Sequence, residues 1–231
     1  MSSDPLQAGL GPWRPAAAVY FLFALTGLAA GYWPASIYHP LALQGGPLPS
    51  HQALAVAQVA FFLLAYPLIL ARRKPGDRFW FPCILESAAL LAATAPLYAA
   101  AAFLADAVWT DCLRSALAVA SFCPLSWAAG RCLGPGGTGG AGRWSSAVLI
   151  VLLLAAVGLP WAGYACRDFL GGARAAPAAD ALWHATPATF AWDAAASRLG
   201  GLWPRPVWVI PLWLAAAAGL AALSARRGSA P

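Results

Sequence analysis

The chain has 231 residues, of which 61% are hydrophobic and only 10% are charged, whereas soluble domains are about 45–50% apolar and about 25% charged. This composition, together with a mean hydropathy of +0.67, excludes a water-soluble globule and a disordered chain, and it predicts an all-α, polytopic membrane protein. The net charge of +6 is explained by arginine in the loops of such a protein, so we expect no nucleic-acid partner.

Six apolar segments have a length suited to crossing a lipid bilayer, for which about 20 residues are needed. They leave little room for a soluble domain, so residues 1–231 are predicted to form a single transmembrane domain. The first segment ends in Gly31-Tyr32-Trp33 and is interpreted as an uncleaved helix rather than a signal peptide. The predicted spans are roughly 16–33, 53–71, 79–105, 107–130, 145–166 and 206–223.

The positive residues orient the six-helix bundle. The positive-inside rule puts the side that is rich in arginine, and with it both termini, in the cytoplasm. The longest loop, 167–205, then faces outward. High usage of Ala, Gly, Pro and Arg beside a single Lys is typical of a GC-rich bacterial genome, so we expect the bacterial inner membrane. The residues on the predicted cytoplasmic side are Arg14, Arg72, Arg73, Lys74, Arg78, Arg131, Arg143, Arg226 and Arg227.

Small residues and prolines recur inside the spans. Small residues let helices approach closely in a membrane, and each proline removes a backbone donor and can kink its helix. This pattern is typical of a moving or cavity-lined bundle, and equally of a merely compact one. The prolines are Pro67, Pro82, Pro96, Pro124, Pro160 and Pro211.

Three charged residues fall within or next to the spans. Glu86 lies about two turns into the third span, where an ionised carboxylate costs about 2.5–3.5 kcal/mol, so it is either a proton- or substrate-linked site, a contact to a partner subunit or a structural hydrogen-bonding group. Asp111 and Arg114 begin the fourth span with the i,i+3 spacing that lets them pair. We favour an internal ion pair over a ligand site for these two residues.

The outer loop 167–205 contains a predicted helix that begins after Thr186, has Pro187 in its first turn and stops at Gly200. It is expected to lie at the membrane interface, with its apolar side chains dipping in and its charged ones in water. The expected interfacial side chains are Phe190, Trp192 and Leu199, and the expected wet ones are Asp193 and Arg198.

Histidine and cysteine give weaker signals. All three histidines, His39, His51 and His184, fall in outer loops, but no pair has metal-ligand spacing, so no metal is predicted. Five cysteines without a CxxC indicate neither a zinc site nor a disulfide framework. Cys112 and Cys166 are both near the outer face, and a disulfide between them is a minor alternative.

Six spans with both termini inside, and a short helical element before the last span, resemble the membrane subunit of ABC-2 type transporters. The resemblance implies a partner that is a sister or identical subunit, a separate ATPase chain as energy source, and no cofactor. It implies ATPase docking at the N-terminal segment near Trp13-Arg14 and at the cytoplasmic loop containing Arg72, Arg73, Lys74 and Arg78. It also implies an outer gate formed by the element with Phe190, Trp192, Asp193 and Arg198.

Two alternatives stay open. Haem-handling proteins of cytochrome c maturation are similar in having six spans and outer histidines, and this weaker resemblance implies haem bound by His39 or His51 together with His184. A non-catalytic accessory subunit of a larger membrane complex is the other alternative. An intramembrane enzyme is disfavoured, because no His-Glu-x-x-His, Gly-x-Ser-x-Gly or paired intramembrane aspartates occur.

Overall fold

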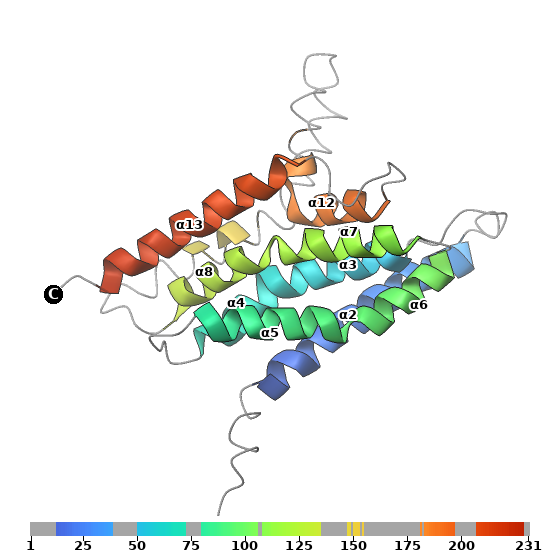
Figure 1. Ribbon diagram of the computed structural model, residues 1–231, viewed down its shortest axis with the longest axis horizontal. Helices are drawn as coiled ribbons and strands as arrows, with labels where there is room; N and C mark the ends of the chain where they lie inside the picture. The colour runs from blue at the N-terminus through green and yellow to red at the C-terminus, as the bar shows by residue number, and fades with distance from the viewer. Residues whose placement is uncertain are drawn as a thin grey trace, which may run out of the picture.

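The computed structural model describes residues 13–38, 50–72, 80–105, 108–134, 183–196 and 207–228, with a few single positions between 147 and 181. Every regular element in this part of the chain is a helix, and no strand occurs in it, which confirms the predicted all-helical class. The helices lie side by side in an elongated bundle, with α12 and α13 together along one side of it (Figure 1).

The first two helices pack closely along one another. Helix α2 (Trp13–Tyr38) contacts α3 (Ser50–Ala60). A Cβ atom added to Gly27 would lie 2.4 Å from the Cβ of Ala57 and 2.8 Å from the carbonyl oxygen of Ala53. Glycine is therefore required at this point, because any larger residue would push the two helices apart.

The next three stretches are long helices that each break near the middle. Helix α3 continues through a π-helical turn, η2 (Phe61–Ala65), into α4 (Tyr66–Ala71). Helices α5 (Trp80–Ala93) and α6 (Ala95–Ala105) are joined at Thr94. Helices α7 (Trp109–Ala120) and α8 (Cys123–Leu133) are joined at a turn over residues 121–122.

Proline explains where these breaks fall. Pro67, Pro96 and Pro124 are the second residues of α4, α6 and α8, so each follows a break directly. A proline has no N–H to donate to the preceding turn and its ring clashes with the carbonyl four residues earlier, while it fits well in the first turn of a new helix. Helix breaks therefore precede three of the six prolines, whereas Pro82 and Pro211 lie in the first turns of α5 and α13 and Pro160 lies outside the described residues.

Three of the predicted spans correspond to helices long and apolar enough to cross a membrane, namely His51–Ala71, Trp80–Phe103 and Trp109–Leu133. The first and last predicted spans are shorter apolar helices within Pro15–Gly31 and Val209–Ser224. The fifth predicted span, 145–166, lies almost wholly outside the described residues. The membrane character is therefore supported, while the count of six spans and the position of the termini stay predictions.

Two further helices cover one side of the bundle. Helix α12 (Pro187–Ala196) packs on α3 and α7, and α13 (Val209–Gly228) packs on α8. Both are visible along the same side in Figure 1, with α12 lying beside α7.

Aromatic rings and a close backbone contact form the centre of the bundle. The rings of Tyr20, Phe61, Phe62 and Tyr66 pack together, with the Tyr20 and Phe61 centroids 4.9 Å apart. The hydroxyl of Ser126 on α8 donates to the carbonyl oxygen of Phe62 in the π-helical turn. This bond helps to hold the irregular turn, whose backbone groups need partners inside a membrane.

Candidate functional site

The short helix α12 is the predicted outer element, and its observed start agrees with the prediction. It begins at Pro187, and the amide of Phe190 donates to the carbonyl of Thr186 across the first turn at 2.9 Å. The hydroxyl of Thr189 donates to the carbonyl of Trp183. Helix α12 ends at Ala196, so the predicted helix is confirmed as far as that residue.

The depth of α12 differs from the prediction. Phe190 was expected at the membrane interface, but its side chain has no exposed surface and its ring lies 6.0 Å from that of Phe122. Ala191, Ala194 and Ala195 are buried as well, whereas Trp192 keeps 37% of its surface exposed. The physical reason is the run of alanines, whose small side chains let α12 pack directly against α3 and α7.

Two side-chain hydrogen bonds hold α12 and the turn before it. The indole N–H of Trp213 on α13 donates to the carbonyl oxygen of Ala185 at 2.9 Å. Nε2 of His51 lies 2.7 Å from the carbonyl oxygen of Ala195, so Nε2 carries the proton and donates. Ala195 lies in the last turn of α12, where carbonyls have no partner within the helix, and His51 provides one.

Asp111 and Arg114 form the ion pair that their spacing predicted. Nη1 of Arg114 lies 3.1 Å from Oδ1 of Asp111. The side chain of Arg114 is only 2% exposed and that of Asp111 is 22% exposed. The hydroxyl of Ser115 donates to the carbonyl of Asp111 at 2.7 Å, which supports the first turn of α7.

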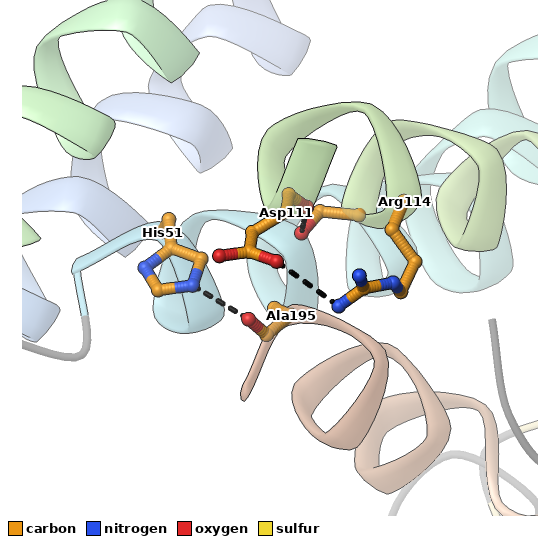
Figure 2. Close-up of polar contacts among 5 residues, drawn as sticks. His51, Asp111, Arg114 and Ala195 are labelled. Atoms are coloured by element: carbon orange, nitrogen blue, oxygen red, sulfur yellow. Dashed lines mark hydrogen bonds and ion pairs between the residues drawn. The ribbon is translucent and has the colours of Figure 1, made fainter. Parts of the chain in front are cut away.

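The ion pair meets the histidine at the end of α12. Figure 2 shows the Asp111 carboxylate between the imidazole of His51 and the guanidinium of Arg114, with the Ala195 carbonyl facing them. The C-terminus of a helix carries partial negative charge, so a cation near it is favourable. Arg114, neutralised in part by Asp111, is therefore well suited to lie where α12 ends, and α3, α7 and α12 meet through these side chains.

A second polar cluster, formed by Asp193, His184 and Trp183, lies on the outward face of α12. Oδ2 of Asp193 lies 3.2 Å from Nδ1 of His184 and accepts a hydrogen bond of 3.2 Å from the indole N–H of Trp183. Burial raises the pKa of Asp193 above its ordinary value, and the contacts with His184 and Trp183 partly offset that rise. His51 and His184 thus both contact α12, at different places.

The interior of the bundle contains a polar network that the sequence reasoning missed. Nε2 of Gln58 donates to the Thr94 hydroxyl at 3.0 Å, and the Tyr98 hydroxyl donates to Oε1 of Gln58 at 2.6 Å. The Tyr20 hydroxyl lies 3.3 Å from the Thr94 oxygen. These buried groups join α2, α3 and α6 at the break between α5 and α6. The signal available in the sequence was Gln58 itself, an amide within an apolar run.

Glu86 is buried, with 1% of its surface exposed. Its Oε2 accepts a hydrogen bond of 2.9 Å from the hydroxyl of Tyr66, the residue that follows the π-helical turn. On the same stretch of α5, the indole N–H of Trp127 donates to the hydroxyl of Ser87 at 2.9 Å. The hydrogen bond to a neighbouring helix is therefore present, and a proton- or substrate-linked role for Glu86 stays a prediction.

The remaining predicted residues are mostly outside the described part of the chain. Arg72 is exposed directly after α4. Among the described residues, Cys112 and Cys123 form no disulfide, and no group of three or more metal-binding side chains could hold an ion. The predicted site residues that lie outside the described residues are Arg73, Lys74, Arg78, His39, Cys166 and Arg198.

Taken together, the described residues place a short helix at the junction of α3 and α7, which belong to two of the candidate membrane spans. A comparison with protein-family models, with characterised proteins and with solved structures finds no match to this chain. The function is therefore argued from the site alone.

Proposed function

We propose that this chain is the membrane subunit of a transporter in the bacterial inner membrane, driven by a separate ATPase chain and paired with a sister or identical subunit. In this proposal α12 is the gate of the transport path. The observation that carries the proposal is the way α12 is seated: it packs on α3 and α7, and side chains of α3 and α13 bind backbone carbonyls near its two ends.

Such a seat is suited to reversible movement. A few side-chain hydrogen bonds and contacts of alanine are broken more easily than a continuous helix. The charged pair Asp111 and Arg114 lies wholly on α7, so this buried ion pair does not have to break when α12 moves.

The broken spans support the same proposal. In transporters, interrupted membrane helices tend to line the path, because irregular backbone is tolerated where protein or water satisfies it. Here all three long candidate spans are interrupted, at Phe61–Ala65, at Thr94 and at residues 121–122. Each interruption is a joint at which one half of a span can shift against the other.

The first experiment is affinity purification of the chain in mild detergent, followed by mass spectrometry and an absorption spectrum. A stoichiometric ATPase chain is the expected result, and replacing Arg72, Arg73, Lys74 and Arg78 with neutral residues is expected to release it. A sample without an ATPase chain contradicts the proposal. A haem absorption band in that sample favours the haem alternative instead.

The gate is tested separately with a cross-link. In a chain whose native cysteines are replaced, H51C together with A195C places two thiols where His51 now binds the end of α12. Bridging them with a short, reducible bifunctional reagent is expected to stop ATP-driven turnover, and reduction is expected to restore it. A matched control links W80C to R131C, two positions in contact on α5 and α8. Full turnover with α12 cross-linked contradicts the assignment of α12 as a gate.

A further inference from the structure

An apolar groove lies between α2 and α3, beside the proposed gate. It has a volume of about 440 Å³ and is lined by nine residues, among them Leu22, Phe23, Thr26, Ala30 and Val56. Trp192 of α12 reaches the same groove. The groove is therefore shared by two helices of the bundle and the gate.

The packing of α2 on α3 explains why a groove forms here. Gly27 lies against Ala53 and Ala57, so the two backbones approach closely over small side chains. Longer side chains such as Leu22 and Phe23 line the groove beside that contact. Gly27, Ala53 and Ala57 make this contact and also form part of the groove lining.

The chemistry of the lining selects a hydrocarbon. No charged residue lines the groove, and its polar side-chain groups are the hydroxyl of Thr26 and the indole N–H of Trp192. Leu22 and Leu25 on α2 are 63% and 52% exposed, so the groove is continuous with an apolar surface of the kind that faces lipid. A polar or charged occupant would lose its hydration here without gaining partners.

The size of the groove distinguishes an acyl chain from a helix or a protein partner as its occupant. A helix with its side chains is about 10–12 Å across, and a stable protein partner buries about 800 Å² on each side. A groove lined by nine residues, one of them the bulky Trp192, offers less than that. A flexible acyl chain is thin enough to enter and is always present at the surface of a membrane protein.

We propose that this groove binds one acyl chain of a bilayer phospholipid, and that the chain packs against the indole of Trp192. The site then links the surrounding lipid to α12 by direct contact. The proposal does not depend on an ATPase partner, so it can fail or succeed independently of the proposed transport function.

The test is native mass spectrometry of the full chain, purified in mild detergent and exposed to mixed micelles of that detergent and dioleoylphosphatidylglycerol. The wild-type chain is expected to retain one phospholipid. A30W fills the groove from an exposed position on α2 and is expected to lower the retained lipid about tenfold, the loss of roughly 1.4 kcal/mol of packing. A29W, an exposed neighbour that does not line the groove, is the matched control and is expected to retain the lipid.

Equal lipid retention by A30W and A29W overturns the proposal, as does a wild-type chain that retains none. A dimer mass that A30W abolishes also overturns it, because a second copy of the chain would then be the occupant. Circular dichroism checks that both variants keep their helices. A second readout is quenching of tryptophan fluorescence by phosphatidylcholine with brominated tails, which is expected to be weaker in W192F than in the wild type. Equal quenching removes Trp192 from the site.

Discussion

Two polar regions of the bundle use different chemistry for different purposes. Where α12 meets α3 and α7, the side chains are charged or chargeable: His51, Asp111 and Arg114. In the interior, Gln58, Thr94 and Tyr98 are joined by hydrogen bonds between neutral groups. A neutral amide or hydroxyl costs far less to bury than an ion, so the network suits the deep interior and the ion pair suits a place where Asp111 keeps some exposure.

This difference indicates which contacts between helices can be broken at low cost. The neutral network joins three helices through side chains that satisfy one another, so separating those helices would leave several donors without partners. At α12, by contrast, the bonds run from side chains of the bundle to backbone carbonyls in and next to the short helix. In the proposed transport function, the interior is therefore the rigid part and α12 is the part that moves.

The largest effect is expected from breaking the ion pair. D111A leaves the buried guanidinium of Arg114 without its carboxylate, and breaking a buried pair on one side typically costs about 3–5 kcal/mol. Because Asp111 is partly exposed, we expect about 3 kcal/mol less free energy of unfolding, measured by titration with SDS from mild detergent. D193N, in the more exposed pair formed by His184 and Asp193, is the control and is expected to change stability by less than about 1 kcal/mol. Similar losses in D111A and D193N would contradict the distinction between the two regions.

Two glycines in apolar surroundings, Gly130 and Gly219, give reference values for the stability changes expected in both polar regions. A Cβ atom added to Gly130 on α8 would lie 2.6 Å from the Cβ of Leu70 on α4, so G130A is expected to cost about 1–3 kcal/mol of stability through overpacking. Gly219 on α13 has no atom within 4 Å of an added Cβ. G219A is therefore expected to raise helix stability by about 0.5–1 kcal/mol. Thermal unfolding of both variants checks this, and a G219A as damaging as G130A would show that α13 is more tightly packed than described.

The neutral network is expected to contribute less than the ion pair. Q58L removes the bonds to Thr94 and Tyr98, and hydrogen bonds between membrane helices are worth about 0.6 kcal/mol each on average, up to about 1.7. We expect a loss of about 1–2 kcal/mol in the same SDS titration. Q52L, at a half-buried position on the same helix, is the control.

A double variant separates the network from simple packing. Y98F removes the hydroxyl that donates to Gln58, so its cost and that of Q58L should overlap in the double variant rather than add. Full additivity would mean that the two residues do not act through their mutual bond.

Much of the fold followed from the sequence, and the parts that did not have identifiable causes. Hydropathy located the helices of the described part of the chain, and three of the six prolines directly follow helix breaks, because both signals act within a few residues of chain. The i,i+3 spacing of Asp111 and Arg114 predicted their pair for the same reason. The burial of Phe190 and the partners of Gln58 depend on which helices become neighbours, and residues 74 positions apart, such as Tyr20 and Thr94, leave no local pattern.

The smallest expected effect concerns pH at the outward face of α12. Because burial is the main cause and raises the pKa of Asp193, the folded protein binds a proton at this carboxyl more readily than the unfolded chain does. The stabilising contribution is therefore fully present below the ordinary pKa of 3.8 and is lost as the pH rises through the raised pKa of the folded state.

As the pH rises from 3.8 through the raised pKa of Asp193, we expect the melting temperature of the wild type to fall relative to that of D193N. Because Asp193 is partly exposed, the change in free energy of unfolding is expected to be less than about 1 kcal/mol. The double variant D193N with H184Q tests the part played by the ion pair. A wild type that instead gains stability over D193N as the pH rises would mean that attraction to His184 outweighs burial. The outward face of α12 would then be stabilised by charge, whereas its C-terminal end is held by the hydrogen bond from His51 to the Ala195 carbonyl.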